Sequence, residues 1–128
     1  MSAAAAQLLD VGNCDPDHAA ISRMLNEHFH VTIDRVMYVD QAMDRMRRRR
    51  YDLVLFNRLI FEDGSEGIEL LKRAGQDASL RDVPIMMVSN FPEAQEAARR
   101  LGGRPGFGKA AIDQPGTIEM LSAYLPRK

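Results

Sequence analysis

The sequence predicts an α/β fold in which five parallel strands alternate with five helices. Apolar segments and turn residues alternate at even intervals along all 128 residues, which is the pattern of repeated strand–helix units. Segments 52–56 and 83–88 are apolar runs too short for helices, as expected of central parallel strands covered on both faces. The helical connections between parallel strands of one sheet are right-handed crossovers. We therefore expect one domain, residues 1–128, with a flavodoxin-like, doubly wound sheet of strand order 2-1-3-4-5.

The first half of the chain contains the first three predicted strands. A strand over 7–11 ends at Gly12-Asn13, and Asp15-Pro16 is typical of an N-cap followed by proline in the first helical turn. Apolar residues at helical spacing predict a helix over 16–29. For the second strand, segments 30–33 and 36–39 compete. A helix over 40–49 then precedes the third strand.

The second half continues the alternation. The acidic, glycine-rich segment 61–67 is a predicted loop, and a third helix opens at 68–72. The strand over 83–88 tolerates a proline at its start, and the helix over 93–101 stops at a Gly-Gly pair. Phe107 belongs to a short fifth strand, and the last helix is predicted over 115–125.

Composition excludes several classes of function. With 17 Lys+Arg against 18 Asp+Glu the formal net charge is −1, whereas a general nucleic-acid binder needs a basic excess. The single Cys14 excludes an internal disulfide framework and favours a reducing compartment, so we expect a cytoplasmic protein. No apolar run approaches the roughly 20 residues that span a bilayer, and the first residues lack the features of a signal peptide. We expect no membrane contact and no cofactor.

Five residues follow the predicted strands at their carboxyl ends, where ligands of doubly wound sheets bind. These residues are Asn13 and Cys14 after the first strand, Asn57 after the third, Ser89 after the fourth and Lys109 after the fifth.

The segments that contain these residues resemble the receiver domain of bacterial two-component response regulators, over nearly the whole chain. Gly-Asn-Cys-Asp-Pro (12–16) is similar to the family's Val-Asp-Asp-Asp-Pro, and Tyr-Asp-Leu-Val-Leu-Phe-Asn (51–57) to its Pro-Asp-Leu-Val-Leu-Leu-Asp. Val-Pro-Ile-Met-Met-Val-Ser (83–89) resembles the strand that ends in a hydroxyl residue, and Lys109 stands at the position of the family's lysine.

The resemblance implies a phosphoryl-accepting site that has lost its acids. In the family, an aspartate after the third strand accepts a phosphoryl group from a histidine kinase, and two further acids help it to hold Mg²⁺. Asn57 occupies the acceptor position, and Asn13 and Cys14 occupy the acid-pair positions. An amide nitrogen is a very poor nucleophile, and Mg²⁺ prefers carboxylate oxygens to amides and thiols. We therefore predict a degenerate pseudo-receiver with no metal site, no catalytic residue and no phosphotransfer.

The hydroxyl and lysine positions are retained as Ser89 and Lys109, although packing and hydrogen bonding alone could equally retain them. We expect the Lys109 ammonium to donate to the side-chain carbonyl of Asn57 or Asn13, in a state that needs neither metal nor phosphate. The position of the family's switch aromatic is Gly106, with Phe107 one residue later, so the relay from the hydroxyl is predicted to be dismantled.

Two functions from different classes are consistent with this pattern. The leading hypothesis is a phosphorylation-independent regulatory module in signal transduction, which binds a protein partner or a second copy through residues 91–125. The alternative is a pocket that senses a small molecule or redox state through Cys14 and Asn57.

Two aspartates, the histidines and a basic run have predicted roles outside these two functions. Asp15 is expected to cap a helix with its carboxylate, and Asp10, inside a buried strand, needs a partner such as an arginine. His18, His28 and His30 lack metal-ligand spacing and are predicted at helix surfaces or ends. The run 47–50 is predicted to be a solvated basic helix end, with an anionic partner surface as the alternative.

Overall fold

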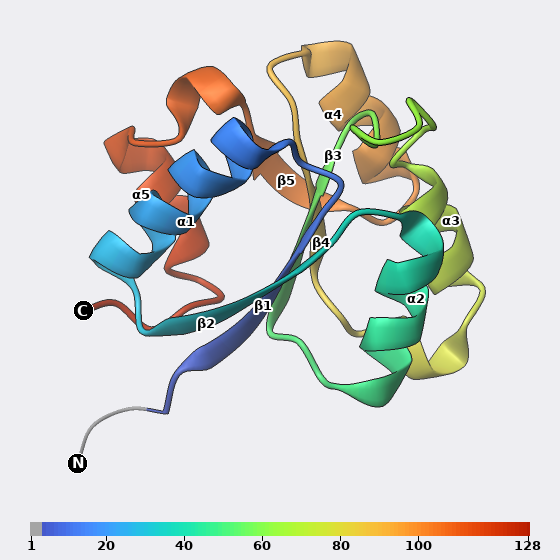
Figure 1. The fold of residues 1–128 in the computed structure, drawn as a ribbon, viewed down its shortest axis with the longest axis horizontal. Helices are drawn as coiled ribbons and strands as arrows, with labels where there is room; N and C mark the ends of the chain where they lie inside the picture. The colour runs from blue at the N-terminus through green and yellow to red at the C-terminus, as the bar shows by residue number, and fades with distance from the viewer. Residues whose placement is uncertain (1–3) are drawn as a thin grey trace.

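The computed structural model describes residues 4–128 and contains a five-stranded sheet with helices on both faces (Figure 1). The strands pair in parallel in the order β2-β1-β3-β4-β5, which confirms the predicted fold class and topology. The strands are β1 (Ala6–Val11), β2 (Val31–Val36), β3 (Leu53–Asn57), β4 (Ile85–Val88) and β5 (Arg104–Phe107). The helices are α1 (Asp15–His28), α2 (Val39–Arg48), α3 (Glu69–Gly75), α4 (Pro92–Arg100) and α5 (Pro115–Leu121), with short 3₁₀ turns η1 (Ala78–Leu80) and η2 (Lys109–Ala111).

The observed boundaries differ from the predicted ones mainly at two places. Strand β2 takes part of each competing segment, because its register against β1 runs without interruption from Val31 to Val36. Helix α5 ends at Leu121 instead of residue 125. At its observed end, the Ser122 hydroxyl donates to the Glu119 carbonyl at 2.5 Å. A proline at position 126 also disfavours helical backbone at the residue before it. Within residues 4–128, no helix is long and apolar enough to cross a membrane.

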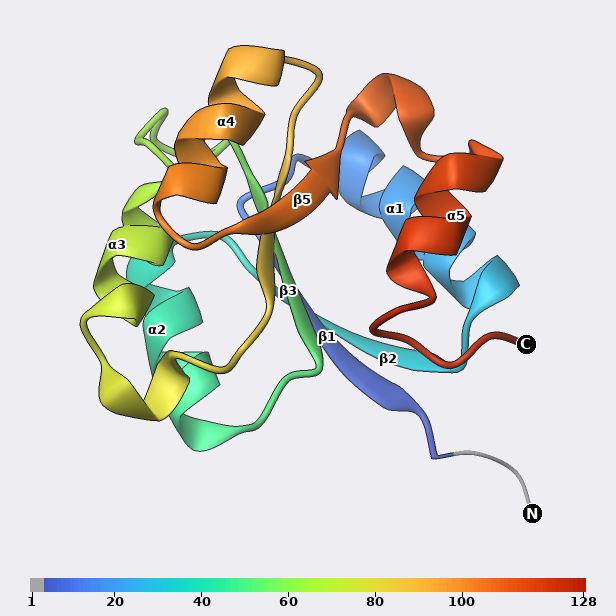
Figure 2. The same ribbon diagram turned by 180° about the vertical axis from the view of Figure 1, so that it is seen from behind.

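Two apolar layers hold the helices against the sheet. Helices α1 and α5 cover one face, and α2, α3 and α4 cover the other (Figures 1 and 2). Alternate residues of the central strands enter opposite layers: Leu53 and Leu55 pack under α1 and α5, whereas Val54 and Phe56 pack under the other three helices. The uninterrupted apolar runs of β3 and β4 are therefore explained by burial on both faces.

The carboxyl ends of all five strands lie at one edge of the sheet, at the top of Figure 1. At this edge, the chain after β1 must turn closely past the β3–α3 loop. Gly12 has φ of 76°, and a Cβ there would lie 2.5 Å from Cδ1 of Ile60. Gly12 is therefore required both by its backbone conformation and by the approach of the neighbouring loop.

Candidate functional site

The loops that follow β3, β4 and β5 enclose a hollow of about 240 Å³ at the carboxyl edge of the sheet. Three of the five predicted site residues, Asn57, Ser89 and Lys109, line it together. Cys14 and Asn13 are not among its lining residues, so the predicted pairing of Cys14 with Asn57 in one pocket is not what the structure shows. The remaining lining residues are Arg58, Leu59, Val88, Asn90 and Phe91. The hollow thus contains two cations and no carboxylate.

The side chain at the acceptor position is tied to its own loop. Asn57 is the last residue of β3, and its Nδ2 donates to the Leu59 carbonyl at 2.6 Å. This hydrogen bond turns the amide toward the start of the β3–α3 loop. Ser89 is buried, and its hydroxyl oxygen accepts from the Phe91 backbone N–H at 3.1 Å.

Lys109 pairs with an aspartate on the first helix. Its Nζ lies 2.5 Å from Oδ2 of Asp17, so the expectation that it would donate to Asn57 or Asn13 is wrong. A carboxylate within reach is a stronger partner for an ammonium than a neutral amide. Burial raises the pKa of Asp17, but hydrogen bonds from Lys109 and the Cys14 thiol, together with the charge of Lys109, hold it below its ordinary value.

The prediction that Asp15 caps α1 is also wrong. Cys14 occupies the N-cap position, without a side-chain cap bond, and Asp15 is the first residue of the helix. The exposed Asp15 carboxylate forms an ion pair with Arg35 of β2, in which Arg35 Nη2 lies 2.8 Å from Asp15 Oδ1. Arg35 also donates to the Asn13 backbone carbonyl at 2.9 Å, which ties β2 to the start of α1.

Asp10 finds its partner on α1, and that partner is a histidine instead of an arginine. The Asp10 side chain is 0% exposed; Oδ1 accepts from Asn13 Nδ2 at 2.6 Å, and Oδ2 lies 2.5 Å from His18 Nδ1. The other ring nitrogen of His18 faces the Ser22 hydroxyl at 3.4 Å. His18, with a side chain 23% exposed, lies near the start of α1, in accord with the predicted helix-end position, and its ring connects that helix to β1.

The donor set at the family's metal position does not fit Mg²⁺. Asn13, Cys14 and Asn57 offer two neutral amide oxygens and a soft sulfur atom, with no carboxylate. Asn13 Oδ1 is buried without a hydrogen-bond partner in residues 4–128, but one neutral oxygen is a weak ligand for a hard cation. No three His, Cys, Asp or Glu side chains of that part of the chain are grouped closely enough to hold a metal ion.

The position of the switch aromatic cannot hold any side chain. A Cβ on Gly106 would lie 2.0 Å from the Met87 carbonyl oxygen. The Gln95 amide of α4 fills this region: its Nε2 donates to the carbonyls of Met87 at 2.9 Å and Ser89 at 3.2 Å, and its Oε1 accepts from the Gly106 N–H at 3.2 Å. One side chain therefore joins α4 to both β4 and β5. Phe107 is buried against the α1–α5 layer.

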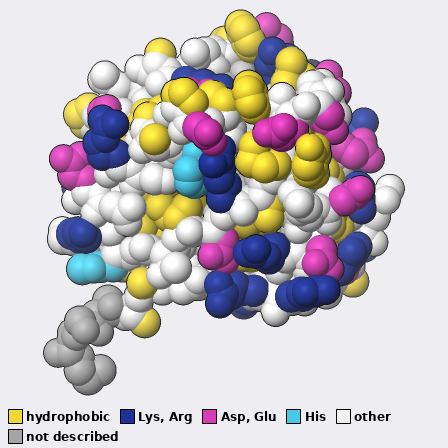
Figure 3. All heavy atoms as spheres, viewed as in Figure 1, with side chains coloured by type: hydrophobic (Ala, Val, Ile, Leu, Met, Phe, Trp, Pro, Cys, Tyr) yellow, Lys and Arg dark blue, Asp and Glu magenta, His cyan; other side chains and the backbone are white. Residues whose placement is uncertain are grey.

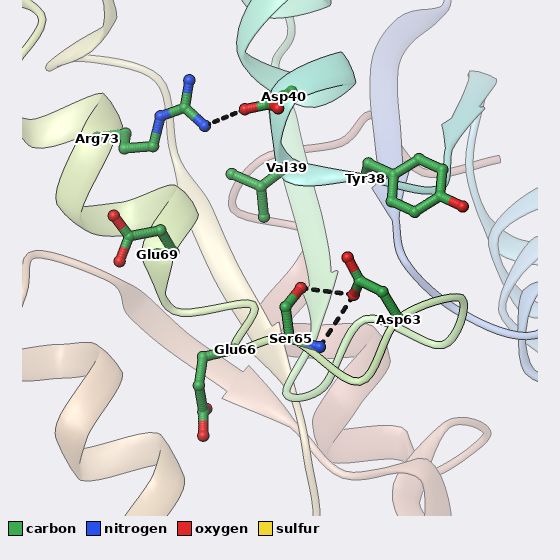
Figure 4. Close-up of a pocket in the computed structure, with 8 residues that line it drawn as sticks. All are labelled: Tyr38, Val39, Asp40, Asp63, Ser65, Glu66, Glu69 and Arg73. Atoms are coloured by element: carbon green, nitrogen blue, oxygen red, sulfur yellow. Dashed lines mark hydrogen bonds and ion pairs between the residues drawn. The ribbon is translucent and has the colours of Figure 1, made fainter.

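A second hollow, of about 430 Å³, lies between α2, α3 and the later part of the β3–α3 loop. Figure 4 shows the carboxylates of Asp40, Asp63, Glu66 and Glu69 around it. Its one cation, Arg73, forms an ion pair with Asp40. The two hollows, which share a loop, are therefore of opposite charge.

The basic run at the end of α2 is largely neutralised within the protein. Arg47, Arg48 and Arg49 each form an ion pair, with Asp77, Asp44 and Asp34 respectively. At the lower edge of Figure 3, dark blue and magenta side chains are interspersed, in accord with these pairs. Most of the run therefore interacts with acids of this chain, at a solvated helix end.

Sequence reasoning missed Asp17, His18 and Gln95. A signal for the first two was present, because the first turn of a helix that follows a parallel strand begins at the carboxyl edge of the sheet, as α1 does (Figure 1). Gln95 had no comparable signal, since it is one of several polar residues on α4.

No family model matches the chain, and no curated protein matches its sequence. Solved structures with the same fold include the phosphorylated cyanobacterial phytochrome response regulator RcpA, at 17% identity and a TM-score of 0.75, with 94% of each chain covered. The chemotaxis response regulator CheY4 of Vibrio cholerae has 16% identity and a TM-score of 0.72, over 94% of this chain and 99% of that one. NtrX of Brucella abortus has 20% identity and a TM-score of 0.69, and the match covers 93% of this chain but 25% of NtrX. The protein therefore has the receiver-like fold.

Proposed function

We propose that the protein is a phosphorylation-independent receiver-like module that acts in signal transduction by binding another protein, and that it catalyses no reaction. The structural neighbours include response regulators, which supports the regulatory role. The observation that carries the proposal is the Lys109–Asp17 pair at 2.5 Å, which engages the retained lysine with a carboxylate of this chain.

The three aspartates at the start of α1 and the end of β1 are each paired within the protein itself. Asp10 is held by His18, Asp15 by Arg35 and Asp17 by Lys109. Clustered carboxylates without a cation would repel one another. Here each acid has its own basic partner, so the arrangement gains nothing obvious from a divalent cation.

The conformational relay of an active receiver is replaced by fixed contacts. Gly106 has no side chain to move, and the three hydrogen bonds of Gln95 hold α4 against β4 and β5. We infer that the face formed by α4, β5 and α5 is presented in one conformation. A groove of about 280 Å³ on it is lined by Pro92, Gln95, Glu96, Arg99, Pro105 and Gly106, within the predicted partner surface 91–125.

Incubation with acetyl phosphate and Mg²⁺, followed by intact mass spectrometry, tests the proposal. We expect no phosphoryl adduct, and no change in the ¹H–¹⁵N spectrum on addition of beryllium fluoride and Mg²⁺. RcpA, whose solved structure is of the phosphorylated protein, serves as the positive control. An acid-stable, base-labile adduct on this chain would overturn the proposal.

A further inference from the structure

We propose that the hollow between the loops after β3, β4 and β5 is a docking site for an acidic side chain of a protein partner. The inference rests on the proposed interaction role and specifies the chemistry of the partner. The hollow lies at the carboxyl edge of the sheet. The partner surface predicted over residues 91–125 is instead the face formed by α4, β5 and α5.

The hollow is lined by an arginine that has no acidic partner within residues 4–128. Arg58 is half-buried and lines the hollow, yet it forms no ion pair with any residue of 4–128. Arg35, also half-buried, pairs with Asp15, and Lys109 pairs with Asp17. Partial burial weakens the hydration of a guanidinium, so a counter-charge from outside stabilises it.

The hollow also has hydrogen-bond donors without partners. The Ser89 oxygen accepts from the Phe91 N–H, which leaves its own proton free to donate. Asn90 Oδ1 accepts from the Ala110 N–H at 3.0 Å, and the Asn90 NH₂ group has no partner among the residues the structure describes. Free donors from two loops, Arg58 after β3 and Ser89 and Asn90 after β4, thus line one volume. A carboxylate, which only accepts, complements them.

An exposed aromatic ring in the lining of the hollow favours a protein over a free anion. The guanidinium of Arg58 lies 5.0 Å from the centre of the Phe91 ring, and Phe91 is 49% exposed. A small anion would leave this ring in water, whereas a peptide segment that carries the carboxylate would cover it. Arginine and aromatic side chains also recur at energetic centres of protein interfaces.

The neighbouring acidic hollow restricts how such a partner can approach. Carboxylates of Asp63 and Glu66, from the later part of the same loop, line that hollow (Figure 4). They repel a second acidic group, so the partner's remaining negative charge is directed away from α2 and α3.

The test is an NMR titration of the ¹⁵N-labelled protein with acetyl-Leu-Glu-Leu-amide. The matched probes are acetyl-Leu-Gln-Leu-amide, which lacks the charge, and sodium acetate, which lacks the apolar flanks. We expect saturable shifts confined to residues that line the hollow, with the glutamate peptide binding at least fivefold more tightly than either other probe.

Two variants sharpen the test. Arg58→Gln is expected to weaken the glutamate peptide at least fivefold, whereas Arg81→Gln, the same change at an exposed arginine outside the hollow, has no effect. Phe91→Ala is expected to weaken the peptide but not acetate. The ¹H–¹⁵N spectrum of each variant verifies its fold.

Three outcomes would overturn the inference: equal affinity for the glutamate and glutamine peptides, equal affinity for peptide and acetate, or equal loss in the Arg58 and Arg81 variants. The second of these would assign the hollow to small anions. None involves a phosphodonor, so failure here is distinguishable from the mass-spectrometric failure of the proposed function.

Discussion

The buried Asp10–His18 pair predicts a large loss of stability when the histidine alone is removed. His18→Ala deletes one of the two side-chain partners of a carboxylate that is 0% exposed. Breaking a buried pair from one side costs about 3–5 kcal/mol. Because the Asn13 hydrogen bond remains and water can enter at the partly exposed His18 position, we expect the lower end, about 3 kcal/mol. At roughly 4 °C per kcal/mol, the Tm falls by about 12 °C.

Urea unfolding at pH 7, followed by circular dichroism, measures this loss. His30→Ala, at an exposed histidine, is the control and should change stability by less than about 0.5 kcal/mol. The double variant Asp10→Leu/His18→Ala removes the stranded charge, so we expect a coupling energy of at least about 1 kcal/mol between the two sites. The reasoning is refuted if His18→Ala behaves like His30→Ala, or if the two changes are additive.

Three further predictions concern packing, pH and the acceptor position. Gly106→Ala is expected to lower the free energy of unfolding by about 1–3 kcal/mol, because the added carbon overpacks against the Met87 carbonyl. Gly116→Ala, with nothing within 4 Å of the added carbon, should raise it by about 0.5–1 kcal/mol. Urea unfolding midpoints measure both changes, and equal midpoints would contradict the close approach at Gly106. The Tyr51 hydroxyl donates to Asp34 Oδ2 at 2.6 Å and is the largest cause of the lowered pKa of the Asp34 carboxyl. The stability that this hydrogen bond contributes is present above the unfolded-state pKa of about 3.9, and it is lost as the pH falls through the folded-state pKa. Tyr51→Phe should therefore cost about 1.5 kcal/mol at pH 7 and progressively less below about pH 4, and a pH-independent difference in urea stability would argue against it. Asn57→Asp alone should gain no phosphoryl adduct from acetyl phosphate and Mg²⁺, because the acid-pair positions still lack carboxylates; an adduct in the intact mass would show that another group holds the metal.

Much of the fold could be predicted because it depends on patterns local to the sequence. The apolar runs of β3 and β4 report burial on both faces, and the handedness of crossovers then leaves few strand orders. The same logic located Asn57, Ser89 and Lys109 together, since residues at the carboxyl ends of parallel strands meet at one edge.

The partners of the charged groups could not be predicted in this way. Asp10 was expected to have a partner such as an arginine, and Lys109 to donate to an amide. The structure instead pairs Asp10 with His18 and Lys109 with Asp17. Periodicity indicates which face of a helix meets the sheet, but it does not give the depth and direction of one side chain within a turn.

The sequence by itself determined the α/β topology and the side chains at the strand ends, the amides of Asn13 and Asn57 and the thiol of Cys14, because residue identity and apolar period can be read along the chain. Only the tertiary structure decided which partners the neighbouring charged groups have. Asp17 and Lys109 belong to opposite ends of the chain, and Gln95 bridges two strands from a helix. Which ion pair or hydrogen bond forms depends on distances of a few ångströms between such segments, and packing of the whole fold sets those distances.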